Sequence, residues 1–361
     1  MQDTTVMSRW LSPLLAFCLS FMIIVGLAPS LGIHLDRQID FWLLWLGTLV
    51  FLALPIIYLE IALAKRSKTT ALNALSSLTR DADASQQWRL VGWLSVVFIA
   101  FLAGGLLSNI TKITMAYIEV PMQSGIFFAI CAVIAFALSF VSRQILVILT
   151  TLGVIASIVL SNVFGVQVQS WHITPVEFKE WGNATILALV ASGLGLGLYW
   201  QTSLATTTKQ NAATQATLPI WIAQLIAVIA FGYFAISAQI PAYTILISAI
   251  FASALLLQLA KEQLQERNVA IIIQFAVLLI GLLIWAVPQM SAIFNSLLML
   301  WGLIICLIYS IFVGWIMKIS HLRKALNFSN EVFYNIWRIA IRIILPLSIL
   351  LAIVSYLGQL I

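Results

Sequence analysis

The chain has 361 residues, of which 62% are hydrophobic and only 8% are charged. Soluble domains carry about a quarter charged residues, so this composition excludes an ordinary soluble protein and indicates an integral membrane protein. A net charge of +6 is also typical of proteins that bind nucleic acid, but here the basic residues lie mainly in alternate short loops, as membrane orientation requires. Nucleic acid is therefore excluded as a partner.

The N-terminus predicts a membrane span that is retained. An apolar run from Leu11 to Ile33 follows Arg9, and it is too long for the core of a signal peptide. The three cysteines, Cys18, Cys131 and Cys306, are widely spaced, and each lies inside an apolar run. This spacing indicates neither a disulfide framework nor a metal site.

Runs of about 20 apolar residues predict eleven membrane-spanning helices. In chain order they cover residues 11–33, 41–64, 90–118, 125–142, 144–166, 184–205, 218–238, 242–260, 269–287, 293–317 and 335–357. Basic residues gather in the loops on one side, namely Arg9, Lys65, Arg66, Lys68, Arg80, Arg89, Arg143, Lys209, Lys261, Arg267, Lys318, Arg323 and Lys324. This alternation predicts a cytoplasmic N-terminus and a C-terminus outside.

Two short segments outside these spans have the pattern of interfacial anchors. Leu72, Leu75 and Leu78 recur at near-helical spacing among polar residues, which predicts a short helix in the cytoplasmic interface. Aromatic residues between 171 and 181 precede the sixth span, and indole rings favour the headgroup level of the outer face.

Two charged residues lie within spans, where each costs at least about 2.5 kcal/mol at the bilayer centre. Glu60 lies near the cytoplasmic Lys65, so a surface salt bridge and a buried role as acceptor for unwound backbone are both consistent with the sequence. Lys112 lies near the outer end of the third span, from which its long side chain reaches the interface.

The most unusual stretch is residues 191–203, ASGLGLGLYWQTS, in which glycines alternate with apolar residues. Glycine inside a helix costs about 1 kcal/mol relative to alanine, so this pattern predicts either local unwinding or close packing against a neighbouring helix. Unwound backbone at membrane depth is tolerated only where protein covers it or where it lines a cavity.

Catalytic patterns are absent from the sequence. No metalloprotease, nucleophile-elbow or phosphate-loop motif appears, and the glycine run lacks the strand and the downstream acid of a dinucleotide site. Asn183 begins an N-x-[ST] triplet, but such triplets also occur by chance. An enzymatic function has no support.

Three regions resemble the bacterial branch of the neurotransmitter:sodium symporters, whose fold is called the LeuT fold. Residues 54–75, LPIIYLEIALAKRSKTTALNAL, resemble the second helix of that family, and residues 87–97, QWRLVGWLSVV, resemble the entrance to its third. Residues 311–327 and 336–353 resemble its tenth and eleventh helices. The residues that carry this last match are Gly314, Trp315, Trp337, Arg338, Arg342 and Pro346.

The resemblance implies an all-α membrane protein with two inverted five-helix repeats, residues 1–166 and 167–317, and an eleventh helix in residues 318–361. It further implies that the first and sixth helices unwind around a substrate and that Glu60 caps the broken helices. The substrate-binding residues on this basis are Val25, Gly26, Leu27, Leu107 (or its neighbour Leu106), Ala191, Ser192, Gly193, Gly195 and Gly197.

The chain departs from the family at both sodium sites. The family's sodium-binding asparagine falls on Pro29, and a hydroxyl of the second site becomes Ile247. The arginine of the outer gate falls on Gly32. The ion ligands that remain are Met22, Val25, Gln224 and Ser248, so sodium coupling is expected to be weakened or absent. No cofactor other than this coupling ion is expected.

These observations favour a secondary transporter of a small solute, amino-acid-like or amine, in the bacterial inner membrane. Leucine at 106 and 107, in place of the family's aromatic hydroxyl, points to an apolar or uncharged cargo. The alternative is a non-transporting membrane subunit or regulator of a protein partner, because cation ligands are lost. The expected partners of a transporter are its solute and membrane lipid.

Overall fold

The computed structural model describes residues 2–31, 38–118, 121–164, 171–191, 213–232 and 242–360. These residues form helices and contain no β-strand, and one isolated bridge pairs Gln38 with His172. The fold expected from the sequence, an all-α membrane protein, is confirmed.

The first half of the chain holds ten helical segments among its described residues. They are α1 (Gln2–Leu27), η1 (Ala28–Leu31), α2 (Ile39–Thr48), η2 (Leu49–Ala53), α3 (Leu54–Ser67), α4 (Ala71–Asp81), η3 (Gln86–Arg89), α5 (Leu90–Tyr117), α6 (Ser124–Leu138) and α7 (Arg143–Phe164).

The described part of the second half is also helical. Its described segments are α8 (Phe178–Val190), α10 (Thr214–Ala230), α11 (Ala242–Glu266), α12 (Ile271–Leu283), η5 (Ile284–Ala286), η6 (Pro288–Met290), α13 (Ser291–Ile311), η7 (Phe312–Ile316), α14 (Ile319–Leu326), α15 (Glu331–Ile339), η8 (Ala340–Ile344) and α16 (Leu345–Leu360).

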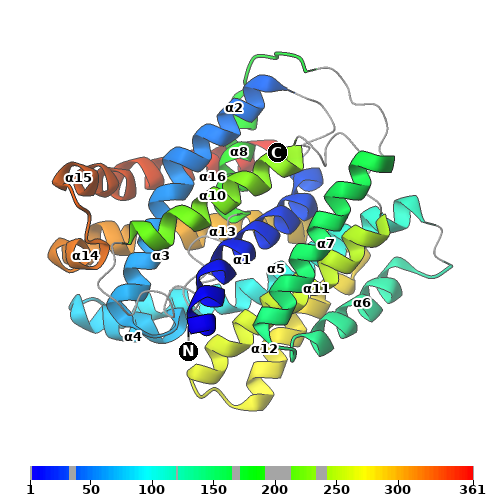
Figure 1. Ribbon diagram of the computed structural model, residues 1–361, viewed down its shortest axis with the longest axis horizontal. Coiled ribbons are helices and arrows are strands. Elements are labelled where there is room, and N and C mark those ends of the chain that lie inside the picture. The colour runs from blue at the N-terminus through cyan, green and yellow to red at the C-terminus, as the bar shows by residue number, and fades with distance from the viewer. Residues whose placement is uncertain are drawn as a thin grey trace.

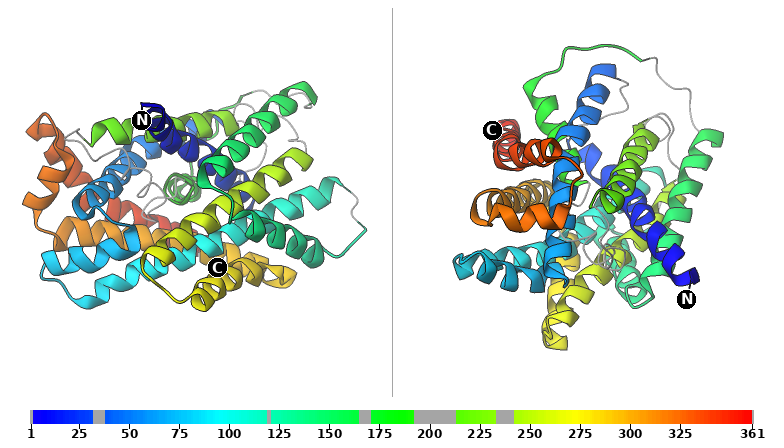
Figure 2. Two further views of the ribbon diagram at one scale, coloured as in Figure 1. Left: turned by 60° about the horizontal axis from the view of Figure 1, so that its bottom comes forward. Right: turned by 60° about the vertical axis from the view of Figure 1, so that its left-hand side comes forward.

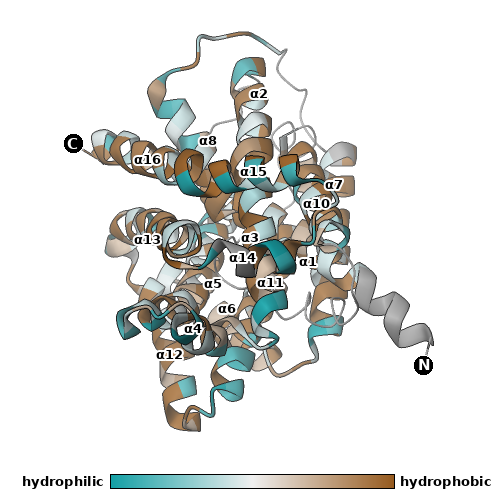
Figure 3. Ribbon diagram, turned by 90° about the vertical axis from the view of Figure 1, so that its left-hand side faces the viewer, coloured by the Kyte–Doolittle hydropathy of each residue, from teal (hydrophilic) through white to brown (hydrophobic). Residues whose placement is uncertain are grey.

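Each of the eleven predicted spans contains a described helix. Seven described segments are long and apolar enough to cross a membrane, and α6, α10 and α12 are shorter apolar helices. Of the predicted sixth span, only the part in α8 is described. Hydrophobic residues cover most of each helix, while hydrophilic residues gather at helix ends and on α14 and α15 (Figure 3).

The centre of the bundle is formed by α5 and by the second half of α1, from Leu15 to Leu27, both of which are mainly apolar on all sides. In α1, Trp10 is exposed, whereas the helix from Leu15 to Leu27 is almost entirely inaccessible. The first half of α1 therefore lies at the edge of the bundle and the second half among the other helices (Figures 1 and 2). Here α1 packs against α5, α7 and α10. A helix that is hydrophobic all round is a buried helix, as observed.

Glycines allow α5 to approach α12 closely. A Cβ added to Gly104 would lie 2.5 Å from Cδ1 of Trp285 and 2.7 Å from the carbonyl of Leu282. One added to Gly281 would lie 2.8 Å from Cβ of Ala100. The indole of Trp285 donates a 3.0 Å hydrogen bond to the carbonyl of Phe101. Small residues with an interhelical hydrogen bond are the typical means of joining membrane helices.

The helix α4 is the short helix that the leucine spacing predicted, and its position in the membrane interface stays a prediction. Leu72, Leu75 and Leu78 are buried, and the first two lie beside Gly92 of α5. The apolar face of α4 is therefore covered by protein and not by lipid. Periodicity shows which face of a helix is apolar, but it does not show what covers that face.

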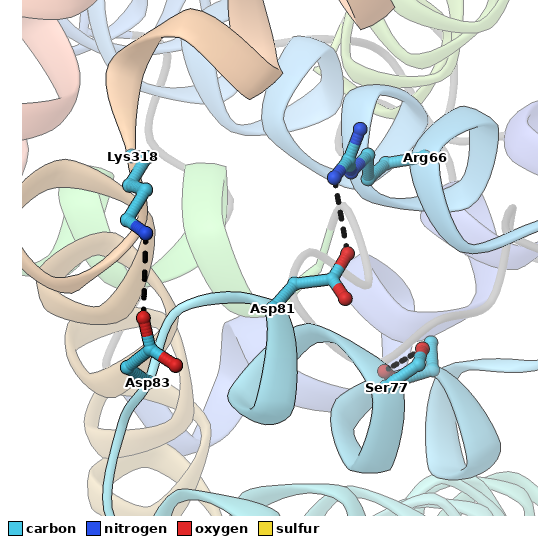
Figure 4. Close-up of polar contacts among 6 residues, drawn as sticks. Arg66, Ser77, Asp81, Asp83 and Lys318 are labelled. Carbon is cyan, nitrogen blue, oxygen red and sulfur yellow. Dashed lines mark hydrogen bonds and ion pairs between the residues drawn. The ribbon is translucent and has the colours of Figure 1, made fainter.

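Ion pairs surround α4 at this end of the bundle. Asp81 at the end of α4 pairs with Arg66 of α3 at 3.0 Å, and Asp83 pairs with Lys318 before α14 at 3.3 Å (Figure 4). Two further ion pairs lie at the same end of the helices, Arg143 with Glu262 and Arg323 with Glu331. We call the residues of these four ion pairs the charged face.

The motifs that carried the family resemblance are packing contacts. The second span contains a π-turn, η2, directly before Pro55, and the indole of Trp221 in α10 donates to the carbonyl of Leu49 at 3.0 Å. The indole of Trp337 in α15 donates to the carbonyl of Pro55 at 3.0 Å. Backbone freed from regular helix must find partners inside a membrane protein, and these tryptophans provide two.

The tenth and eleventh spans are joined in the same way. Arg342 of η8 donates through Nε to the carbonyl of Gly314, and the indole of Trp315 donates to the carbonyl of Arg342 at 3.2 Å. A Cβ on Gly314 would lie 3.1 Å from Cγ of Arg342, so glycine allows the close approach.

Candidate functional site

The first span changes conformation later than predicted. The sequence placed unwound backbone at Val25, Gly26 and Leu27, but α1 remains α-helical through Leu27, and a 3₁₀ turn follows from Ala28 to Leu31. Pro29 explains the position of the change. Proline lacks the N–H that would continue the α-helical pattern, and it disfavours α geometry in the residue before it.

Gly26 packs directly against the third span. A Cβ at this position would lie 2.9 Å from Cδ1 of Leu106 and 3.5 Å from its Cα. Leu27 and Leu107 are completely inaccessible, and Val25 is 6% exposed. The structure therefore brings the predicted substrate residues of the first and third spans together, in an apolar environment in which Leu106 covers Gly26.

The sixth-span part of the predicted site is described only at its edge. The helix α8 ends at Val190, and Ala191 is buried directly after it. Ser192, Gly193, Gly195 and Gly197 lie outside the described residues. Their assignment as substrate residues stays a prediction.

Glu60 lies inside the protein and not at the membrane surface. It is 1% exposed, which rules out a side chain at the surface, and its role as acceptor for unwound backbone stays a prediction. Glu60 interacts electrostatically with Cys306 and Tyr309 of α13, and Tyr309 faces Ser95 of α5. The hydroxyl of Tyr309 is buried and makes no well-formed hydrogen bond within the described part of the chain. Glu60 thus joins a cluster between the second, third and tenth spans.

The four residues proposed for ion binding are all buried and come from three helices, with Met22 and Val25 both on α1. Met22 and Gln224 lie on α1 and α10, which pack along each other. Ser248 of α11 donates its hydroxyl proton to the carbonyl of Thr244 at 2.7 Å and lies against Gly153 of α7, where a Cβ would come within 2.4 Å. The neighbouring Ile247 is 51% exposed and faces away from Ser248. In the described residues, no group of three or more His, Cys, Asp or Glu side chains is placed to hold a metal ion.

Uncharged hydrogen bonds join five elements at the end of the bundle opposite the charged face. Asn109 of α5 and Asn295 of α13 exchange two amide hydrogen bonds, 2.8 and 3.2 Å long. The next residue, Ser296, accepts from the hydroxyl of Tyr356 in α16 at 3.3 Å.

Next to Tyr356 in α16, Ser355 donates to the carbonyl of Phe178 at the start of α8, at 3.0 Å. Gln359 donates to Oδ1 of Asn183 in α8 at 3.3 Å, and Asn183 donates to the carbonyl of Leu31 at 3.0 Å. We call these seven side chains the neutral belt: Asn109, Asn183, Asn295, Ser296, Ser355, Tyr356 and Gln359.

Asn183 was not recognised in the sequence as part of a site. It was noted only as a chance triplet, yet it is 4% exposed, and its amide joins η1, α8 and α16. The sequence did contain a pattern that marks the face of α16 on which the partner of Asn183 lies. Ala352, Ser355, Tyr356 and Gln359 have i, i+3, i+4, i+7 spacing, which places them on one helix face.

A separate groove of about 910 Å³ lies on the outside of α6. Its lining runs from Gln123 to Ile134 of α6 and includes Ala286 of η5, and it is mainly apolar. None of its lining residues belongs to the predicted substrate or ion sites, so the groove is not the candidate site.

Comparison with known proteins supports the fold. No family model matches the chain, and no curated protein matches it by sequence. Among solved structures, the chain is similar to MhsT in complex with L-phenylalanine, with 16% sequence identity, coverage of 95% of this chain and 98% of that chain, and a TM-score of 0.60. At this identity the likeness shows the fold alone. It agrees with the LeuT fold that the sequence resemblance implied, and it does not extend to membership of the symporter family.

Proposed function

We propose that the protein is a secondary transporter that moves a small solute, amino-acid-like or amine, by alternating access around Val25, Gly26, Leu27 and Leu107. The observation that carries this proposal is the similarity in fold, over nearly the whole chain, to a protein solved with L-phenylalanine. Because Gly26, Leu106 and Leu107 form an apolar environment, the favoured cargo has an apolar or uncharged side chain.

The test is a thermal-shift screen of detergent-purified protein against amino acids and amines, with and without sodium. A ligand that binds the folded state at 100 times its dissociation constant stabilises it by about 2.7 kcal/mol, so a genuine cargo raises the apparent melting temperature. Uptake of the same compound into proteoliposomes then shows transport. Gly26→Val should abolish the ligand shift, whereas Gly358→Val, a matched control with nothing within 4 Å of its Cβ, should keep it.

A second candidate function is a non-transporting subunit or regulator of a protein partner. The observation that favours it is the side chain of Leu106, which fills the space beside Gly26. If no compound in the screen shifts the melting temperature, and Leu106→Ala does not restore such a shift, the transporter proposal is wrong and this second function is favoured.

We propose that any sodium coupling is weaker than in the symporter family. A hard cation needs several oxygen ligands, and Pro29 and Ile247 offer no side-chain oxygen. Ser248 is the best remaining side-chain ligand. Its hydroxyl donates a hydrogen bond to the carbonyl of Thr244, which leaves the lone pairs of the hydroxyl oxygen for a cation. Ser248→Ala should abolish any residual effect of sodium on the melting temperature. Uptake that depends strictly on a sodium gradient and survives this substitution would contradict the proposal.

We propose a bacterial inner-membrane location with the charged face in the cytoplasm, the N-terminus inside and the C-terminus outside. The basic loops at the charged face support this orientation. Cysteines introduced near Arg80 and Asn327 should react only with permeant reagents, and one near His172 should also react with impermeant reagents. The opposite labelling pattern would reverse the orientation.

A further inference from the structure

The amide of Asn183 occupies a point where three elements meet. It is 4% exposed, it lies one residue after Gly182 in α8, and each side of the amide has a partner. Its nitrogen donates to the carbonyl of Leu31, at the end of the 3₁₀ turn that follows α1. Its oxygen accepts from Gln359, near the end of the last helix.

The carbonyl of Leu31 needs such a donor. The last carbonyls of a helix have no partner within it, and inside a membrane protein an unpaired carbonyl is costly. Along the 3₁₀ turn, the side chain of Ser30 donates to the carbonyl of Leu27 at 2.7 Å, and Asn183 donates to Leu31. The side chain of Asn183 therefore joins the end of the first span to the sixth span.

The helix α16 is held against α8 by close packing as well as by hydrogen bonds. A Cβ on Gly182 would lie 2.3 Å from Oγ of Ser355, and Ser355 donates to the carbonyl of Phe178. Tyr356 on the same face of α16 donates to Ser296 of α13. The last helix thus bridges the sixth and tenth spans, and Asn183 extends that bridge to the first.

We propose that Asn183 is a positioning residue that holds the end of the first span and the last helix to the sixth span, and that the neutral belt thereby closes its end of the bundle over the site around Val25 and Gly26. This inference rests on the proposed function, in which one end of the bundle opens to admit solute. Opening at the neutral belt then requires the two hydrogen bonds of Asn183 to break.

The experiment measures how fast a thiol reagent reaches the site. Cys18, Cys131 and Cys306 are replaced by alanine, Val25→Cys is added as the reporter, and labelling is followed in detergent-purified protein. Asn183→Leu preserves side-chain size but removes both hydrogen bonds, and it should raise the labelling rate about 10-fold. Gln359→Leu removes one of the bonds and should raise the rate about 3-fold.

The double variant tests whether the two residues act together. Once Asn183 is replaced, Gln359 has already lost this partner, so Asn183→Leu with Gln359→Leu should label no faster than Asn183→Leu alone. Multiplied effects, about 30-fold, would mean that the two residues act separately and would overturn the proposal.

A matched control distinguishes positioning from general loosening. Gln274 of α12 is 5% exposed and donates to the carbonyl of Val269 at 2.7 Å, at the opposite end of the bundle. Gln274→Leu should lower the apparent melting temperature about as much as Asn183→Leu, yet leave the labelling rate unchanged. Equal labelling of these two variants would show that Asn183 has only a structural role.

Failure of this inference is distinguishable from failure of the proposed function. The labelling assay needs no solute, so it reports on the belt whether or not a cargo is found. A ligand-induced thermal shift together with unchanged labelling in Asn183→Leu would leave the transporter proposal standing and overturn the role of Asn183.

Discussion

The two ends of the bundle are held together by different kinds of contact. At the charged face, four ion pairs join α3, α4, α7, α11, α14 and α15. At the neutral belt, hydrogen bonds between uncharged amides and hydroxyls join α5, α8, α13, α16 and η1. The ionic side chains range from 23% exposed at Arg143 to 83% exposed at Asp83, and none of them is fully buried. In the belt, Asn183 and Ser355 are buried. Exposed ion pairs contribute about 0 to 1 kcal/mol and are screened by salt, while buried neutral bonds are little affected by it.

This difference indicates that the two ends respond to different conditions. The charged face can exchange partners with water and ions at little cost. A buried amide of the neutral belt, such as that of Asn183, has no such substitute, because an amide that loses its partner inside the protein is left unpaired. We therefore expect substitutions in the belt to cost more stability than substitutions at the charged face. The following predictions run from the largest expected effect to the smallest.

The largest effect is expected at Gly182, where the belt packs most closely. Gly182→Val forces atoms against Oγ and Cβ of Ser355, 2.3 and 2.7 Å from the added Cβ. Overpacking of this kind should cost about 2 to 3 kcal/mol, measured by unfolding titration in mixed micelles. Gly92→Ala near the charged face meets the flexible side-chain ends of Leu75 and Leu72 at 3.1 and 3.2 Å, with Cα of Leu72 at an ordinary 3.4 Å, and should cost less than about 1 kcal/mol. Equal losses of unfolding free energy in the two variants would contradict the expectation that the belt tolerates substitution less well than the charged face.

An intermediate effect is expected at the amide pair of the belt. Asn109→Leu or Asn295→Leu alone should cost about 1 to 2 kcal/mol, because each leaves a part-buried amide without its partner. The double variant should cost less than the sum of the two, since it removes both amides, and the difference gives the coupling energy directly. If the two single losses of unfolding free energy add up to the loss in the double variant, the hydrogen bonds between Asn109 and Asn295 contribute no coupling energy.

The smallest effect is expected from salt. Asp83→Asn should cost about 0.5 kcal/mol or less at low salt, and that cost should vanish near 1 M salt, where the Debye length is about 3 Å. Tyr356→Phe removes the hydrogen bond to Ser296, and it should cost about 0.5 to 1 kcal/mol at both salt concentrations. A salt-dependent cost for Tyr356→Phe would contradict the neutral character of the belt.

The sequence predicted the helices better than their contacts. Hydrophobic runs located a described helix in every predicted span, because span length is set by the membrane itself. For α4, the spacing of Leu72, Leu75 and Leu78 was correct, but their covering by α5 depends on Gly92, which is distant in the sequence and carries no periodic signal.

The candidate site was predictable only in part. Resemblance assigned Gly26 and Leu107 or Leu106 to one substrate site, and the structure has Leu106 in contact with Gly26. The end of α1 was misplaced because the resemblance put unwound backbone at Val25 to Leu27, whereas Pro29, which lacks an N–H, sets where the α-helix stops. Asn183 was missed because the sequence shows only a single amide in an apolar run. That pattern is the same whether the amide has hydrogen-bond partners on distant helices or has none.

The tryptophans that brace the second span also constrain how the protein is made. The carbonyl of Pro55 and the indole of Trp337 that donates to it are 282 residues apart, and those of Leu49 and Trp221 are 172 apart. The ribosome therefore releases the acceptors long before it makes the donors. The eleventh helix can complete its contacts only on a second span that is already in place, so assembly in the membrane must finish with the C-terminal helices docking onto the N-terminal half.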